Sequence, residues 1–163
     1  MASWSEFAAS SPALAVSVRG LLFQYGTGLG YLATVRPDGG PRVHPVSPAI
    51  VDGRLYCCLL RSPKRRDLYH DDRYALHAFP SDDSEDEAGL DGRAIRLGDP
   101  RVVRRISAAM RAEPQLDWAL FELTVESAFY VHRRSAPVLG RDTHAADRWT
   151  DEVSRELCRA QAG

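Results

Sequence analysis

The chain has 163 residues, of which 44% are hydrophobic and 26% are charged, and its formal net charge is -1. This length is typical of one domain, so we expect a single domain over residues 1–163. The balanced charge gives no electrostatic reason to expect a nucleic-acid partner. No apolar run is long enough for a transmembrane helix, so no membrane partner is expected. The three cysteines lack zinc-site spacing and predict free thiols in a reducing cytoplasm.

The N-terminal part predicts two helices. Residues 3–9 have one apolar side and are expected to form a short helix. Ser11 is a suitable N-cap, and Pro12 is a residue that favours the first helical position. The second helix is therefore predicted from Pro12 to about Gln24, where glycines begin to interrupt the pattern.

Three runs with strand character follow, and they lie at 31–36, 41–51 and 54–60. The second run contains Pro45 and Pro48, which cannot donate hydrogen bonds to a neighbouring strand. We therefore expect the sheet to be split there, with space for another group on the vacated side. Asp52-Gly53 is a strong signal for a two-residue hairpin into the third run.

A basic segment comes directly after the third strand. Ser62 can cap a short helix that starts at Pro63, and helix N-termini bind anions. Lys64, with Arg61 or Arg65, adds positive charge at the same place. These groups together predict a phosphate site, and the alternative is a solvated basic turn.

The rest of the chain predicts further strands at 74–79, 93–97 and 118–126. Residues 128–132 are expected either to continue the last of these strands or to pair with it. Helices are predicted at 99–112 and 151–160. The segment 81–91 contains six acids in eleven residues and is expected to be a solvated loop rather than a metal site. Residues 133–148 are expected to be irregular. This order predicts an α+β fold, a six-stranded antiparallel barrel with flanking helices.

Few side chains in this pattern suggest catalysis. His44 is a weak candidate for a general base, because no serine or cysteine nucleophile motif accompanies it. Cys57 and Cys58 are adjacent, so they should lie on opposite faces of the third strand. Buried structural thiols are the favoured interpretation, since vicinal cysteines rarely close a disulfide. No metal-ligand spacing is present.

Several motifs in this order resemble the pyridoxamine 5'-phosphate oxidase-like superfamily, the flavin-binding split barrels. The resemblance is carried by Leu32-Ala33-Thr34-Val35, Asp38-Gly39, Pro41-Arg42-Val43-His44-Pro45-Val46, Asp52-Gly53-Arg54-Leu55-Tyr56, Ser62-Pro63-Lys64 and Asp67-Leu68. It covers about residues 12–80 well and continues loosely beyond them. The chain lacks the Arg-containing C-terminal motif of true pyridoxamine-phosphate oxidases, so vitamin B6 oxidation is not expected.

This resemblance implies a six-stranded split barrel and a homodimer with FMN at the interface. The cofactor-binding residues that it implies are His44, Pro45, Val46 and Ser47 along the isoalloxazine ring, Cys57 and Cys58 near the flavin, and Ser62, Lys64 and Arg65 at the phosphate. The implied function is an FMN-dependent oxidoreductase acting on an unidentified small molecule. An 8-hydroxy-5-deazaflavin-dependent reductase and a non-catalytic flavin or heme carrier are the alternatives. A relative that has lost cofactor binding also stays open.

Overall fold

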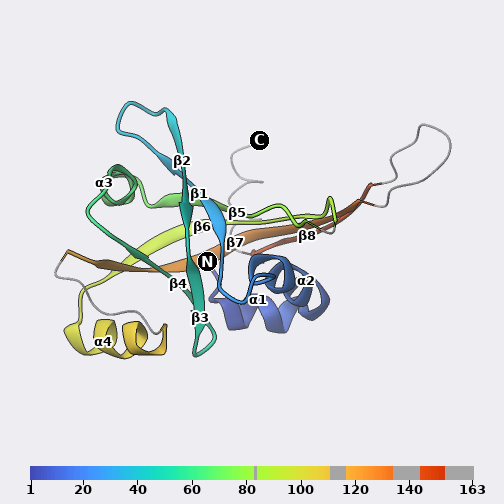
Figure 1. Cartoon of the computed structure of the whole chain (residues 1–163), viewed down its shortest axis with the longest axis horizontal. Coiled ribbons are helices and arrows are strands. Elements are labelled where there is room, and N and C mark those ends of the chain that lie inside the picture. The colour runs from blue at the N-terminus through green and yellow to red at the C-terminus, as the bar shows by residue number, and fades with distance from the viewer. Residues whose placement is uncertain (83, 111–116, 134–143, 153–163) are drawn as a thin grey trace.

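The computed structural model describes residues 1–82, 84–110, 117–133 and 144–152. In these residues eight strands form one antiparallel sheet, and four helices lie around it (Figure 1). The helices are α1 (Trp4–Ser10), α2 (Pro12–Leu22), α3 (Pro63–His70) and α4 (Pro100–Ala109). The strands are β1 (Gly30–Val35), β2 (Pro41–Val46), β3 (Pro48–Val51), β4 (Arg54–Leu59), β5 (Arg73–Ala78), β6 (Glu87–Leu97), β7 (Ala119–Arg133) and β8 (His144–Thr150).

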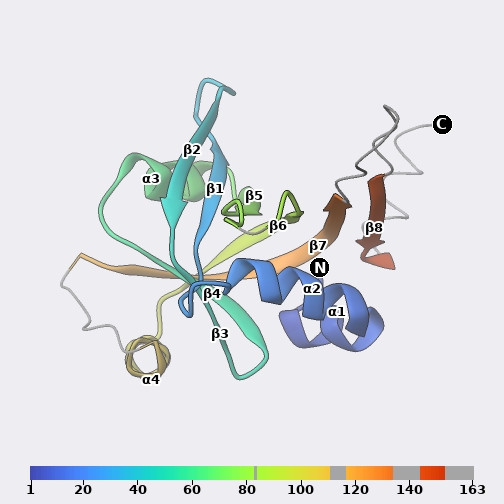
Figure 2. The same cartoon turned by 45° about the vertical axis from the view of Figure 1, so that its right-hand side comes forward.

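The predicted break in the second strand run is confirmed. The strand order is β2-β1-β5-β6-β7-β4-β3, and β8 pairs with the remaining length of β7. β2 and β3 thus lie at opposite edges of the sheet, although only Ser47 separates them in the chain. Pro45 and Pro48 flank the break and lack the N–H that a continuous ladder would need. Figures 1 and 2 show the β1–β2 and β3–β4 hairpins projecting in opposite directions.

The turn between β3 and β4 also follows the sequence signal. Asp52 has a φ of 49° and Gly53 a φ of 71°, so both residues are in the left-handed region. Two successive residues of this kind are typical of the tight hairpin turns that match the twist of paired strands. The prediction for Asp52-Gly53 is confirmed, and this hairpin forms one wall of the cleft described below.

Two segments predicted as loops contain strands. β6 begins at Glu87, within the acidic segment 81–91, and β8 occupies 144–150, of which residues 144–148 were predicted as irregular. Both predictions were wrong for those residues because pairing with β7 orders them, and the local sequence does not show that pairing. The sheet therefore has more strands than the predicted six. Most of the predicted C-terminal helix, 151–160, lies outside the described residues.

The acidic segment is anchored at Asp86, which is only 9% exposed. Its carboxylate accepts a hydrogen bond from the Tyr130 hydroxyl at 2.7 Å and pairs with Nδ1 of His132 at 2.9 Å. These contacts fix the start of β6 against the far end of β7. Burial of a carboxylate requires such partners, since an unpaired buried charge is costly.

The apolar side chains form two clusters on opposite faces of the sheet. The larger one packs α1 and α2 against the barrel interior, with Phe7, Leu32 and Phe121 fully buried. The smaller one packs α4 against β4 and β7 through Tyr56, Ile106 and Leu120. No helix in the described part of the chain is long and apolar enough to cross a membrane.

A buried carboxylate fixes α3 to the β1–β2 hairpin. Asp67 is 2% exposed, and its Oδ2 accepts hydrogen bonds from Nε of Arg42 at 2.7 Å and from the Thr34 hydroxyl at 2.9 Å. The three residues belong to α3, β2 and β1 respectively. Hydrogen bonds to a charged group are stronger than neutral ones, so this contact fixes the position of α3.

We predict that Asp67→Ala lowers the free energy of unfolding by about 2–3 kcal/mol, because it leaves a partly buried guanidinium without its carboxylate. Urea unfolding measures the change. The matched control is Asp72→Ala, which removes an exposed ion pair with Arg93 and should cost less than about 1 kcal/mol. Equal losses in the two variants would contradict a structural role for the buried pair.

Candidate functional site

One cleft combines most of the residues that the sequence singled out. Its volume is about 850 Å³, within the range of about 300–1,000 Å³ typical of small-molecule sites. It lies where the β2–β3 break, the end of β4 and the start of α3 meet. Its wall is formed by Phe23, residues 26–29, 45–51 and 58–62, and by Lys64, Phe79, Ala109, Met110 and Trp118.

The strand break itself supplies one wall. Pro45, Val46 and Ser47, which the family resemblance implied along a flavin ring, all line the cleft. The loop before β1 packs closely against this wall. A Cβ on Gly28 would lie 2.2 Å from the Pro48 carbonyl oxygen, so only glycine permits the approach.

The basic segment supplies a polar end. Lys64 Nζ donates a hydrogen bond to the Pro45 carbonyl at 3.0 Å, which links α3 to the strand break. An ammonium has three donors, so others remain for a ligand. Ser62 precedes α3 without capping it, and its buried Oγ has no hydrogen-bond partner in the described residues. Because a buried hydroxyl normally has a partner, this arrangement fits a bound oxyanion.

The opposite end of the cleft is apolar and contains sulfur. The Cys58 thiol lies 3.8 Å from the Met110 thioether sulfur. Trp118, Phe23 and Phe79 add aromatic surface. Burial raises the pKa of the Cys58 thiol to about 11. The thiol is therefore protonated near neutral pH and contributes to packing rather than acting as a nucleophile.

Three of the predicted site residues lie outside the cleft lining. Cys57 is 1% exposed and packs in the larger apolar cluster, on the opposite face of β4 from Cys58. His44 lies half-buried on β2, with its Nε2 buried and unpartnered in the described residues. Arg65 donates through Nη1 to the Asp117 carbonyl. Arg61, the other arginine considered for the phosphate, does line the cleft.

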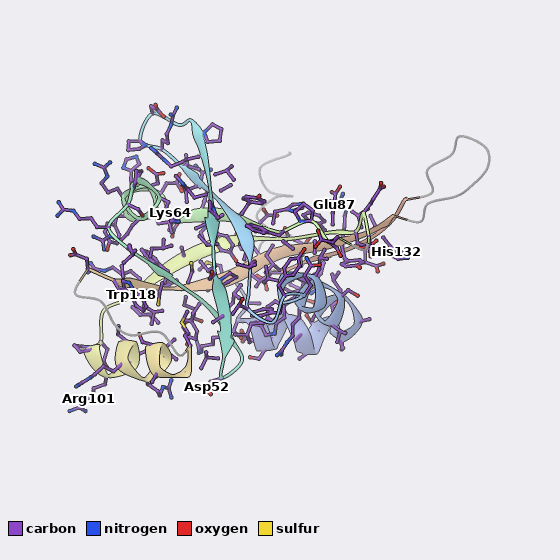
Figure 3. The ribbon with its side chains drawn as sticks, in the orientation of Figure 1. Asp52, Lys64, Glu87, Arg101, Trp118 and His132 are labelled. Carbon is purple, nitrogen blue, oxygen red and sulfur yellow. The ribbon has the colours of Figure 1, made fainter. Side chains whose placement is uncertain are left out.

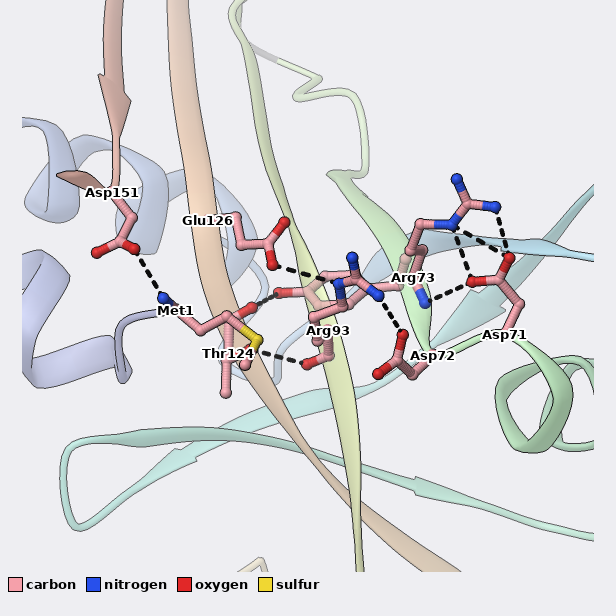
Figure 4. Close-up of polar contacts among 9 residues, drawn as sticks. Met1, Asp71, Asp72, Arg73, Arg93, Thr124, Glu126 and Asp151 are labelled. Carbon is pink, nitrogen blue, oxygen red and sulfur yellow. Dashed lines mark hydrogen bonds and ion pairs between the residues drawn. The ribbon is translucent and has the colours of Figure 1, made fainter. Parts of the chain in front are cut away.

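A second depression, beside the end of α3, is a poorer candidate because its charges are already paired (Figure 4). Arg73 binds Asp71 at 2.5 Å, and Arg93 bridges Asp72 and Glu126. Hydrogen bonds from Arg73 lower the pKa of Asp71 to about 2. No group of three or more metal-ligating side chains is present among the described residues.

Sequence reasoning missed the apolar end of the cleft. Phe23 and Gly28 come from the loop before β1, and Met110 and Trp118 from the end of α4 and the start of β7. Figure 3 shows Trp118 on the same side of the molecule as Lys64. The available signals were an aromatic residue near a helix end and a tryptophan at a strand start, and neither indicates a cleft.

No family model and no curated protein matches the chain. Several solved structures do match the chain. A heme binding protein from Mycobacterium smegmatis is 23% identical with a TM-score of 0.59, over 86% of this chain and 60% of that protein. HutZ, the heme storage protein from Vibrio cholerae, is 13% identical with a TM-score of 0.54, over 71% of this chain and 89% of that one. PhzG from Burkholderia lata, in complex with tetrahydrophenazine-1-carboxylic acid, is 14% identical with a TM-score of 0.54, over 91% of this chain and 89% of that one.

The chain has the fold of these solved structures, a split β-barrel with flanking helices. The fold expected from the sequence is thereby confirmed. All three identities are below 25%, so the likeness concerns the fold. This chain spans about 60% of the length of the mycobacterial protein.

We predict that iodoacetamide alkylates Cys58 slowly at pH 7 and about tenfold faster for each pH unit up to pH 9, because only the thiolate reacts. Burial raises the pKa of Cys57 to about 12, so it should not react in the folded protein. Mass spectrometry on a Cys158→Ser background measures the rate, with Cys58→Ser as the control. A rate that is already constant above pH 7 would show an ionised thiol and contradict the prediction.

Proposed function

We propose that this protein binds FMN in the cleft and acts as a flavin-dependent oxidoreductase on a small molecule. The observation that carries the proposal is the polar end of the cleft. There the Ser62 hydroxyl has no partner in the described residues, and the Lys64 ammonium lies at the N-terminus of α3. Hydroxyl, ammonium and free helix N–H groups are together suited to a phosphate monoester.

The rest of the cleft suits a flat ring system. Pro45, Val46 and Ser47 offer a strand edge, and Trp118 and Phe79 offer aromatic surface. A bound flavin would supply hydride-transfer chemistry, while the protein sets orientation and excludes water. PhzG, which shares the fold, binds a tetrahydrophenazine carboxylic acid. That likeness supports a small, planar molecule as the substrate class.

An 8-hydroxy-5-deazaflavin is the alternative cofactor, because the strand edge at Pro45–Ser47 and the phosphate-binding groups of the cleft suit both cofactors. A heme carrier is a second candidate function, favoured by the fold shared with two heme-binding proteins. Cys58 and Met110 place two sulfur atoms in the cleft, and both side-chain types serve as axial heme ligands. Absorbance of the purified protein separates flavin bands from a Soret band.

We also propose a homodimer that closes the cleft. Tyr31, Ala33 and Val35 point away from the barrel interior, and their partners on β2 are Pro45, Val43 and Pro41. Val43 is 58% exposed and Tyr31 41%. This apolar face meets the cleft at Pro45 and at Phe79, whose ring stacks on Tyr31 at 4.3 Å. A second copy seated on the face would therefore cover the cleft edge.

Lys64→Ala should weaken FMN binding by about 1–3 kcal/mol, or roughly 5- to 150-fold in Kd, because one charge-assisted contact to the phosphate is lost. Fluorescence titration of the apo protein with FMN and with riboflavin measures this. Riboflavin lacks the phosphate and should bind both forms equally. The matched control is Arg104→Gln on α4, which is exposed and forms no ion pair in the described residues. A Kd for FMN unchanged by Lys64→Ala would remove this residue from the site.

Val43→Asp should shift the protein from dimer to monomer, since a charge at the centre of an apolar interface cannot be solvated there. Sedimentation velocity at several concentrations measures the shift. Val16→Asp is the control, because Val16 is 72% exposed on α2, away from this face. A wild-type chain that sediments as a monomer at all concentrations would overturn the dimer.

A further inference from the structure

A cluster of positive side chains outside the cleft has no counter-charge. It comprises Arg65 and Arg66 of α3 and Arg96 of β6. None of these guanidinium groups forms an ion pair with a carboxylate in the described part of the chain, in contrast to the arginines of Figure 4. The acid within α3, Asp67, is already bound by Arg42 and Thr34. The excess positive charge at this place is therefore not neutralised by α3 itself.

Two of these arginines converge on one aromatic ring. The guanidinium carbon of Arg96 lies 5.1 Å from the centre of the Tyr69 ring, and that of Arg65 lies 6.0 Å from it. The ring is 48% exposed and rests at 5.8 Å on that of Phe121, which is fully buried. Attraction to the ring holds each cation in place. Two like charges around one ring nevertheless repel each other, and an anion beside them would remove that repulsion.

The unused hydrogen-bond donors of Arg65 also favour a bound anion. Arg65 uses Nη1 on the Asp117 carbonyl, and its buried Nε has no partner in the described residues. A buried N–H without an acceptor costs free energy. The guanidinium fork offers two parallel N–H groups that match the oxygens of phosphate or carboxylate.

We propose that Arg65 and Arg96, ordered by Tyr69, form a second anion site that binds the phosphate or carboxylate group of a small ligand. Tyr69 and Arg96 do not line the cleft, and neither does Arg65, so the site is separate from the Ser62–Lys64 end of the cleft. This second anion site does not depend on whether the cleft binds flavin. Since Arg65 contacts Asp117, next to the cleft residue Trp118, an anion there lies beside the cleft.

The test is an NMR titration of the ¹⁵N-labelled apo protein with pyrophosphate and, separately, with citrate at low ionic strength. The Nε–H signals of Arg65 and Arg96 should shift with one common Kd, and the shifts should weaken as salt is added. The probe with the lower Kd identifies phosphate or carboxylate as the preferred group. Signals that do not move with either probe would overturn the proposal.

Variants separate this site from the cleft. Arg96→Gln should raise the Kd reported by Arg65 by about fivefold or more, while Arg96→Lys, which keeps the charge, should restore part of the affinity. Lys64→Ala should leave this Kd unchanged, and so should Arg104→Gln. A loss of the Arg65 and Arg96 shifts in the Lys64→Ala variant would place the anion in the cleft and overturn the proposal. An unchanged Kd in the Arg96→Gln variant would also overturn the proposal.

Discussion

The absence of a backbone N–H at proline determines how this chain is arranged around its cleft. Pro45 and Pro48 lie on either side of Ser47, and neither has an N–H to donate to a neighbouring strand. The chain therefore ends β2 at one edge of the sheet and begins β3 at the other. The two hairpins diverge, and the side of the strand left without a partner becomes a wall of the cleft. A continuous strand at this place would close the same opening.

The break creates an opening, and two polar contacts hold the basic segment against it. Asp67 connects α3 to β1 and β2 through Thr34 and Arg42, and Lys64 connects α3 to the Pro45 carbonyl. The first contact is buried, so water cannot replace it at low cost. The polar end of the cleft is therefore fixed relative to its apolar wall before any ligand binds. Such pre-organisation reduces the ordering cost that a ligand would otherwise meet.

The sequence predicted the parts of the fold and site that depend on neighbours in the chain. The Asp52-Gly53 turn, the helix starts at Pro12 and Pro63 and the proline break are local signals, and each was found where it was expected. The expected side-chain caps Ser11 and Ser62 form no capping hydrogen bond. β8 and the first residues of β6 were missed because pairing with β7, and not their own sequence, orders them. The apolar end of the cleft was missed for the same reason. Phe23, Met110 and Trp118 meet only after the sheet has formed.

Charge is distributed unevenly over a chain whose net charge is close to zero. Arg73 and Arg93 are neutralised by neighbouring acids, whereas the cations around α3 are not. The acidic segment cannot neutralise them, because Glu87 and His132 lie toward the opposite end of the molecule from Lys64 (Figure 3). Clefts bordered by one sign of charge concentrate ligands of the opposite sign and raise their association rates. The field of the protein therefore favours anionic ligands at the cleft.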